Sequence, residues 1–453
     1  MDKSKTNVVV FFTDQQRWDT SGLHGNPLDL MPNFDRLARA GTHLVNSFTC
    51  QPVCGPSRAC LQTGLYATQT GVHVNGLGLK PGVKTLADYF DAAGYHTGYY
   101  GKWHLAPGQL KVAPEYRGGY TEWLAANWTE ACSDAYACVL YDGDMQEVRL
   151  PGYRVDALTD AAIRFIDRNA HRPFFLMVSY LEPHHQNNRD DYPPPDGYRE
   201  RYTDRWTPPD LKSLGGSSAY QLGGYYGMVK RLDEALGRVY DALKSLNLLE
   251  NTILLFTSDH GCHFKTRNDE YKRSCHDSSM RIPTMFYGAD FVGGGSRTEL
   301  FSLIDVVPTL LDAAGLSVPD ELPGHSLMPR LRGEETPWPE EVFVQISESE
   351  CARAIRTTRW KYSVRSPFEV NWPTVMDKRA HAKEYKEVYL YDLESDPYEL
   401  VNLAGGVQYR EVCDALLGRL RRLMADAGEP PCTIEPAEPR DLYWRRPEIV
   451  SWN

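Results

Sequence analysis

The chain has 453 residues, of which 42% are hydrophobic and 24% charged, and its net charge is −11. This composition is typical of a folded globular protein and excludes an intrinsically disordered chain. The acidic balance argues against nonspecific binding to nucleic acid or to an anionic membrane surface. The length favours one large domain followed by a smaller one.

The amino terminus is polar and is followed by an apolar run over residues 8–12. That run is too short for a signal peptide or a membrane span. If Met1 is the native start, we therefore expect a cytoplasmic protein. The ten cysteines are scattered along the chain without a close Cys-x-x-Cys pair, so we expect most of them to be buried or free thiols.

Predicted strands and helices alternate along the first three quarters of the chain. Apolar runs rich in β-branched and aromatic side chains predict strands at residues 7–13, 96–100, 173–180, 252–258 and 284–287. Apolar residues at helical spacing predict helices at residues 33–40, 85–93, 155–169 and 219–246. This alternation indicates an α/β fold with a large, mainly parallel sheet flanked by helices on both faces.

The pattern changes after about residue 340. Short strands are predicted at residues 342–347, 354–357, 361–364 and 387–391, followed by a helix at residues 408–427. We interpret this part as a small antiparallel sheet with a closing helix. The predicted domains are therefore a catalytic α/β domain, residues 1–340, and a C-terminal subdomain, residues 341–453.

Two long stretches, residues 110–150 and 185–216, lack clear periodicity. The first is rich in aromatic residues and the second in Pro, Asp and Arg. We predict that both are long loops. Long loops in enzymes often carry specificity, so they are candidates for a substrate subsite, although plain surface insertions explain them equally well.

Polar side chains follow four of the predicted strands. In chain order, they are Asp14 and Gln15, then Lys102 and His104, then His184, and finally Asp259 and His260. Ligands of open α/β sheets bind at the carboxyl ends of the strands, so we expect these side chains to converge.

Four of these residues form a candidate site for a divalent metal ion: Asp14, Gln15, Asp259 and His260. Three of them offer hard oxygen ligands and one offers a nitrogen. The alternative is that Asp259 and His260 simply begin a turn after a strand.

The run from Cys54 to Arg58 predicts the start of a helix, because Pro56 suits a first turn. Cys54 then lies near the positive end of the helix dipole, a place that favours an anion. Arg58 lies one helical turn further on, within reach of the same anion. A plain cysteine at a helix start, with Arg58 on a solvated face, is the alternative.

Several motifs together resemble those of the type I sulfatases, which belong to the alkaline phosphatase superfamily. Cys54-Gly55-Pro56-Ser57-Arg58 matches the Cys-x-Pro-Ser-Arg motif of this family, and Gly101-Lys102-Trp103-His104-Leu105 matches its Gly-Lys-Trp-His-Leu motif. Further resemblances lie at residues 13–16, 59–64, 183–184, 272–283 and 391–403, so the likeness covers nearly the whole chain. It implies an alkaline-phosphatase-like fold.

The resemblance implies that Cys54 is the precursor of the nucleophile. In this family a maturation enzyme oxidises the motif cysteine to Cα-formylglycine, whose hydrate attacks the sulfur of a sulfate ester beside a divalent metal ion. Residue 54 thereby joins the metal ligands.

The resemblance also implies roles for five other residues. Arg58, Lys102 and Lys272 are expected to bind the sulfate oxygens. His184 is expected to be the general acid for the leaving oxygen, and His104 to take up the second hydroxyl proton.

One motif departs from the family pattern, because Asp259-His260 stands where the family usually has Asp-Asn or Asp-Gln. We expect Ca²⁺ on family grounds, although a nitrogen ligand suits Mg²⁺ or Mn²⁺ better. The phosphonate monoester hydrolases share Asp-His here but lack the Lys-Trp-His motif. Lys102 and His104 therefore favour sulfate esters.

We expect a sulfatase that acts on a sulfated carbohydrate. The alternative enzyme is a phosphonate monoester hydrolase or phosphodiesterase of the same superfamily. A non-catalytic sulfated-glycan-binding protein on the same scaffold is the third hypothesis. That hypothesis predicts loss of the nucleophile or the metal ligands, yet Cys54, Asp14 and Asp259 are all present.

Overall fold

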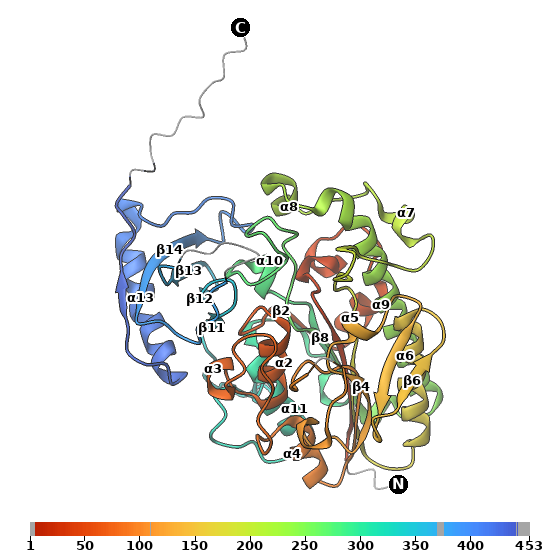
Figure 1. Cartoon of the computed structure of the whole chain (residues 1–453). Coiled ribbons are helices and arrows are strands. Elements are labelled where there is room, and N and C mark those ends of the chain that lie inside the picture. Colours follow the sequence, from red (N-terminus) through yellow and green to blue (C-terminus); the bar gives the residue numbers. More distant parts are fainter. Residues whose placement is uncertain (1–4, 109, 369–375, 441, 443–453) are drawn as a thin grey trace.

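The computed structural model describes residues 5–108, 110–368, 376–440 and 442, and two sheets organise them (Figure 1). Met1, on which the expected location depends, lies outside the described residues. The larger sheet has the strand order β10 (Gly295–Ser302), β2 (Thr42–Phe48), β9 (Thr284–Tyr287), β8 (Thr252–Ser258), β1 (Asn7–Thr13), β7 (Phe174–Ser179), β3 (His96–Lys102), β4 (Glu122–Ala126), β5 (Cys138–Asp142) and β6 (Glu147–Leu150).

The centre of the larger sheet is parallel. β8, β1, β7, β3 and β4 all run in one direction, whereas β9, β5 and β6 run antiparallel to their neighbours. The predicted α/β fold is confirmed, with a sheet that is mixed at both sides. Because the central strands are parallel, their carboxyl ends meet at one edge.

Helices cover both faces of this sheet. α6 (Arg154–Arg168) and α9 (Ser218–Ser245) lie on one face with α1 (Pro32–Ala40), and α2 (Cys54–Thr63), α4 (Leu86–Ala92) and α11 (Val306–Ala313) lie on the other (Figure 1). Side chains of β1 alternate between the two cores, with Val9 and Phe11 in the first and Val8 and Val10 in the second. Within the described ranges, no helix is both long and apolar enough to span a membrane.

The two stretches predicted as long loops contain regular elements, so that prediction was wrong in part. Residues 110–150 include β4, α5 (Thr129–Cys132), β5 and β6, and residues 185–216 include α7 (Tyr198–Tyr202) and α8 (Pro209–Leu214). These strands have only four or five residues, too few for a clear periodic pattern. They extend the sheet beyond β3.

The second sheet begins at residue 341. Its strands are β11 (Glu341–Ile346), β12 (Ala352–Thr357), β13 (Trp360–Arg365), β14 (Glu384–Asp392) and β15 (Thr433–Glu435), and α13 (Arg410–Asp426) packs on them. The first four strands are antiparallel as predicted, and β15 pairs with β14 in parallel. The exact domain boundary stays a prediction.

A buried ion cluster joins the two parts of the chain. Asp277 lies on α10 (Asp277–Met280), whereas Lys361 and Arg356 lie on the second sheet. Lys361 Nζ pairs with Asp277 and lies 2.5 Å from Glu399 Oε1, and Arg356 Nη2 lies 3.4 Å from Asp277 Oδ2. These ion pairs are buried, so they fix the C-terminal subdomain against the start of α10.

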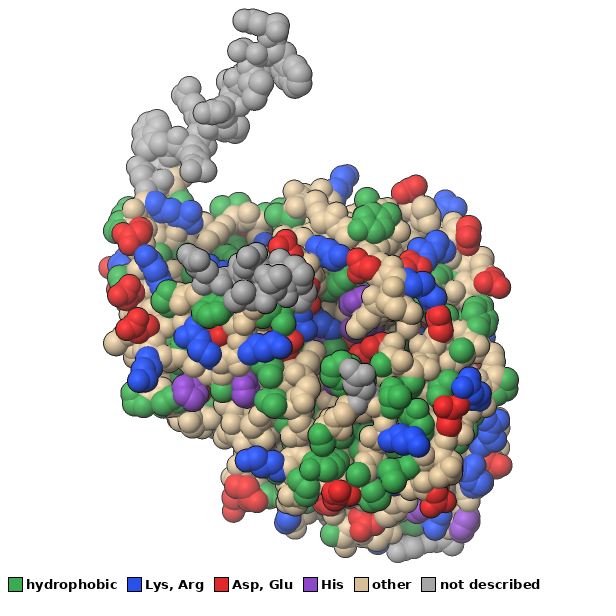
Figure 2. Space-filling view, in the orientation of Figure 1, with side chains coloured by type: hydrophobic (Ala, Val, Ile, Leu, Met, Phe, Trp, Pro, Cys, Tyr) green, Lys and Arg blue, Asp and Glu red, His purple; other side chains and the backbone are tan. Residues whose placement is uncertain are grey.

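Two further short α-helices are α3 (Ala67–Thr70) and α12 (Met328–Leu331). On the face shown in Figure 2, acidic and basic side chains are interspersed over both parts of the molecule. The catalytic candidates are buried, at the carboxyl edge of the central strands.

Candidate active site

Two neighbouring strands place two carboxylates side by side. Thr13 ends β1 and lies opposite Ser258 at the end of β8, so the next residues, Asp14 and Asp259, are neighbours. The backbone N–H of Gln15 donates to Asp259 Oδ1 over 2.9 Å. Both carboxylates are fully buried. The ends of these two strands therefore converge, as the sequence predicted.

A close approach of β3 to β7 brings Lys102 to the same edge. Gly101 has a φ of +109°, and a Cβ on it would lie 2.0 Å from the carbonyl oxygen of Ser179. Only glycine fits at this position. Lys102 Nζ then lies 2.9 Å from Asp14 Oδ2.

Helix α2 begins at Cys54, as the sequence predicted. Ser57 Oγ donates to the carbonyl oxygen of Asp259 over 2.6 Å, and Asn75 Oδ1 accepts from the Gly55 N–H over 2.9 Å. These bonds hold the positive end of the helix dipole against the pair of carboxylates.

Four buried residues form a candidate metal centre. One ligand atom from each of Asp14, Cys54, Asp259 and His260 lies within 4.8 Å of the others. His260 Nε2 is 3.3 Å from Cys54 Sγ and 3.5 Å from Asp259 Oδ1. Burial and the neighbouring Asp14 raise the pKa of Asp259 to about 6. A divalent cation would offset the repulsion between the Asp14 and Asp259 carboxylates, so this set of donor atoms fits a divalent cation.

Gln15 lies at the side of this centre. Its amide Nε2 donates to Tyr192 Oη over 2.9 Å, and its Oε1 is 3.4 Å from Lys272 Nζ. The amide oxygen of Gln15 therefore faces Lys272, which itself lies 3.0 Å from Cys54 Sγ.

Three cations surround the candidate metal centre. Arg58 Nη2 lies 2.9 Å from Asp14 Oδ2 and 3.1 Å from Asp259 Oδ2. Arg58 is only 1% exposed, which excludes the alternative of a solvated helix face. Lys272 Nζ lies 3.0 Å from Cys54 Sγ. The third cation is Lys102.

The surroundings of Cys54 favour a negative charge. Burial and Asp14 would raise the pKa of its thiol, but Lys102, Lys272 and His260 outweigh them and the pKa falls to about 6. An anion at this position is therefore stabilised by the protein itself.

The two predicted acid–base histidines differ in their contacts. His184 Nε2 lies 3.0 Å from Lys272 Nζ, and its Nδ1 lies 2.6 Å from the carbonyl oxygen of His185. Both ring nitrogens of His104 are buried without a hydrogen-bond partner in the described part of the chain. His104 is nevertheless close to α2, because a Cβ on Gly55 would lie 3.3 Å from its carbonyl oxygen.

Burial and a neighbouring lysine lower the pKa of each histidine. For His184 the lysine is Lys272. For His104, burial together with Lys102 lowers the pKa to about 3. Both rings are therefore neutral near neutral pH.

Two buried glutamates at the site were not predicted from the sequence. Glu130 Oε1 lies 3.0 Å from Lys102 Nζ. Glu348 Oε2 accepts from the Asn75 N–H over 2.7 Å, and its Oε1 lies 2.9 Å from Arg273. No motif marks either residue, because each meets its partner only through the fold.

Comparison with known proteins identifies related sequences and structures. Residues 6–316 match the family described as Sulfatase, and residues 269–426 match the C-terminal domain of N-sulphoglucosamine sulphohydrolase. An ulvan-active sulfatase of Formosa agariphila is 28% identical, over 94% of this chain and 83% of its own. An N-acetylglucosamine-6-O-sulfatase of Bacteroides thetaiotaomicron is 25% identical, over 90% and 84%.

The fold is also found in a solved structure. The yidJ protein of Bacteroides fragilis, described as a sulfatase, superposes with a TM-score of 0.81 at 24% identity. The match covers 95% of this chain and 97% of that chain. It confirms the predicted alkaline-phosphatase-like architecture.

Glu348 connects the C-terminal subdomain to the start of α2 through Asn75. We expect Glu348→Gln to lower kcat for an aryl sulfate about tenfold, because Asn75 and Arg273 lose the carboxylate that orients them. KM should stay within about twofold, since Glu348 does not line the cluster of cations. Steady-state kinetics of the Glu348→Gln variant and of the unsubstituted protein measures the separate effects on kcat and KM.

The matched control for this experiment is Glu350→Gln, two residues further along the same segment. Glu350 pairs instead with Arg365 of the second sheet, at 3.3 Å. We expect its kinetics to equal those of the unsubstituted protein. Equal losses in both variants would show that Glu348 acts only on folding.

Proposed function

The chain belongs to the sulfatase family and is a sulfuric ester hydrolase, and from this premise we propose that it removes sulfate from a carbohydrate. The observation that carries the proposal is Cys54 at the start of α2, within the candidate metal centre and 3.0 Å from Lys272 Nζ. Two related sequences support the carbohydrate substrate, since one is named as ulvan-active and the other for N-acetylglucosamine.

We propose that Cys54 acts as its formylglycine derivative, produced by a maturation enzyme. The hydrate of this aldehyde would supply the attacking oxygen. A divalent cation, when bound, would polarise the sulfate. The protein's own contribution is electrostatic. Burial and ion pairs already fix Arg58 and Lys102, and burial and hydrogen bonds fix Lys272. These cations therefore offset charge in the transition state without reorganising.

The histidines are proposed to move the protons. His184 keeps one proton at Nδ1, directed at the His185 carbonyl oxygen, and its Nε2 faces the Lys272 ammonium. The Lys272–His184 pair thus holds one transferable proton for the leaving oxygen. The neutral His104 ring has two unpartnered nitrogens and is proposed to accept the second proton.

We expect poor leaving groups to depend on His184. His184→Ala should lower kcat/KM for a sugar sulfate by about a hundredfold or more, because an alkoxide leaves slowly without a proton. The loss for an activated aryl sulfate should be much smaller. His185→Ala is the matched control and should affect both substrates alike. Equal losses in the His184 variant would contradict its role as the acid.

We propose Ca²⁺ as the bound cation, with Mg²⁺ or Mn²⁺ as alternatives. Asp14, Gln15 and Asp259 offer oxygens, which Ca²⁺ prefers, and His260 offers one nitrogen. Titration of the metal-stripped protein should raise its melting temperature most with Ca²⁺, because the cation stabilises the folded state by binding to it. A larger rise with Mn²⁺ or Mg²⁺ would contradict the assignment.

The reaction itself is tested on enzyme produced together with a maturation enzyme. Mass spectrometry of the peptide containing Cys54 should show an aldehyde in place of the thiol methylene. This preparation should hydrolyse an aryl sulfate with a higher kcat/KM than the matching aryl phosphonate ester. Preference for the phosphonate would favour a phosphonate monoester hydrolase. No turnover of either, despite full conversion, would favour a non-catalytic glycan-binding protein.

A further inference from the structure

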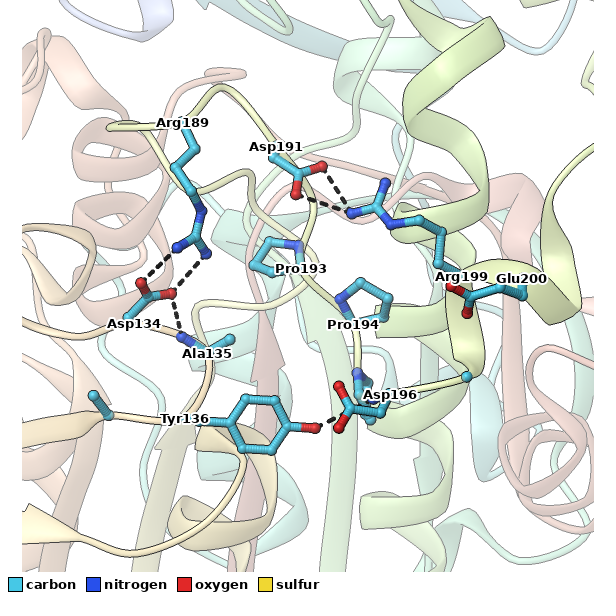
Figure 3. A pocket seen from close by; sticks show the side chains of 13 residues that line it. Asp134, Ala135, Tyr136, Arg189, Asp191, Pro193, Pro194, Asp196, Arg199 and Glu200 are labelled. Atoms are coloured by element: carbon cyan, nitrogen blue, oxygen red, sulfur yellow. Dashed lines mark hydrogen bonds and ion pairs between the residues drawn. The ribbon is translucent and has the colours of Figure 1, made fainter.

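A cavity of about 610 Å³ lies between the segments around residues 134–137 and 189–200 (Figure 3). Its volume falls within the range of small-molecule sites. Tyr136 lines its lower side in this view, and its hydroxyl accepts from the Asp196 N–H over 3.2 Å. The Tyr136 side chain is 53% exposed, so much of its ring is open to a ligand.

The cavity lies on the same edge of the sheet as the catalytic residues. Residues 127–137 connect the carboxyl end of β4 to the amino end of its antiparallel partner β5, and residues 185–200 follow the carboxyl end of β7. Gln186 Nε2 joins the two segments by donating to the carbonyl oxygens of Glu130 and Ser133. Glu130 in turn pairs with Lys102, so the segment that lines the cavity also contacts the active site a few residues earlier.

The charges of the cavity differ from those of the active site. Its charged lining consists of Asp134, Asp191, Asp196 and Glu200 against Arg189 and Arg199. Four carboxylates and two guanidinium groups give a net charge of −2.

Both arginines are already paired within the cavity. Arg189 forms two bonds to Asp134, of 2.6 and 2.7 Å, and Arg199 Nη2 donates to both oxygens of Asp191 (Figure 3). The carboxylate of Glu200 has no hydrogen bond or ion pair to another described residue. A ligand in the cavity therefore finds free carboxylate oxygens as hydrogen-bond acceptors, whereas both guanidinium groups are already paired with aspartates.

We propose that this cavity binds the sugar residue adjacent to the sulfated one, and that it selects a neutral ring over an anionic ring. This inference rests on the proposed carbohydrate substrate. Carboxylate oxygens accept hydrogen bonds from sugar hydroxyls, and the exposed face of Tyr136 packs on the apolar face of the ring. A uronate or a second sulfate in the same position meets like charge that no free arginine offsets.

The test uses a panel in which each sulfated monosaccharide is offered alone, linked to galactose, and linked to glucuronate. With matured enzyme, galactose should raise kcat/KM about tenfold over the monosaccharide, and glucuronate should not. A gain from glucuronate equal to or above that from galactose would overturn the selection of a neutral ring. Equal kcat/KM for all three forms would overturn the subsite.

Variants locate the effect in the cavity. Tyr136→Ala should remove most of the gain from galactose while leaving aryl sulfate kinetics within about twofold, and Tyr136→Phe should keep the gain. Tyr220→Ala is the matched control, because Tyr220 is 68% exposed and does not line the cavity. If linked galactose still raises kcat/KM in the Tyr136→Ala variant, Tyr136 does not pack on that sugar ring.

The charge is tested by Glu200→Lys, which should raise kcat/KM for the glucuronate-linked substrates. An unchanged preference would overturn the electrostatic part of the proposal. If the enzyme hydrolyses the aryl sulfate but none of the saccharides, the carbohydrate substrate itself is wrong, and the cavity proposal is overturned with it. Failure of galactose alone overturns only the cavity proposal.

Discussion

The ion pairs between Arg58 and the two carboxylates of Asp14 and Asp259 are the interaction on which the rest of the site depends. Two like charges buried at the ends of adjacent strands would each carry a large desolvation cost. Arg58 lies 2.9 and 3.1 Å from them, and Lys102 adds a second cation to Asp14. The site can therefore keep negative ligands for a cation inside a buried, low-dielectric environment. Helix α2 delivers Arg58 and Cys54 together, so the proposed nucleophile precursor and the stabilising charge share one rigid element.

The C-terminal subdomain is part of this arrangement and does more than close the fold. Glu348 reaches from the segment after β11 to the Asn75 N–H, and Asn75 bonds the first turn of α2. The buried pairs of Asp277 with Lys361 and Arg356 fix the same subdomain near the segment that carries Lys272. Loosening the subdomain would thus disturb both Cys54 and its neighbouring lysine, although none of its described residues belongs to the candidate metal centre.

The sequence was sufficient for the parts of the site that depend on local order. Apolar runs mark the strands and their ends, so the sequence predicts that Asp14, Lys102 and Asp259 lie at one edge of the sheet, as the structure shows. Glu130 and Glu348 were missed, because a buried glutamate is identified by its partner, and neither partner is near in sequence. The short strands β4 to β6 were missed for a related reason. Their pairing with β3 and with one another, rather than their own periodicity, makes them strands.

The contrast in charge between the catalytic cluster and the neighbouring cavity bears on specificity. Lys102 and Lys272 make the inner site attractive to an anion, whereas the cavity beside it carries a net charge of −2. A substrate with one sulfate and a neutral neighbouring ring satisfies both regions in only one orientation. A uniformly anionic chain gains at the inner site but is repelled beside it. Selectivity can therefore arise from repulsion outside the active site, without any change in the residues that bind and release sulfate.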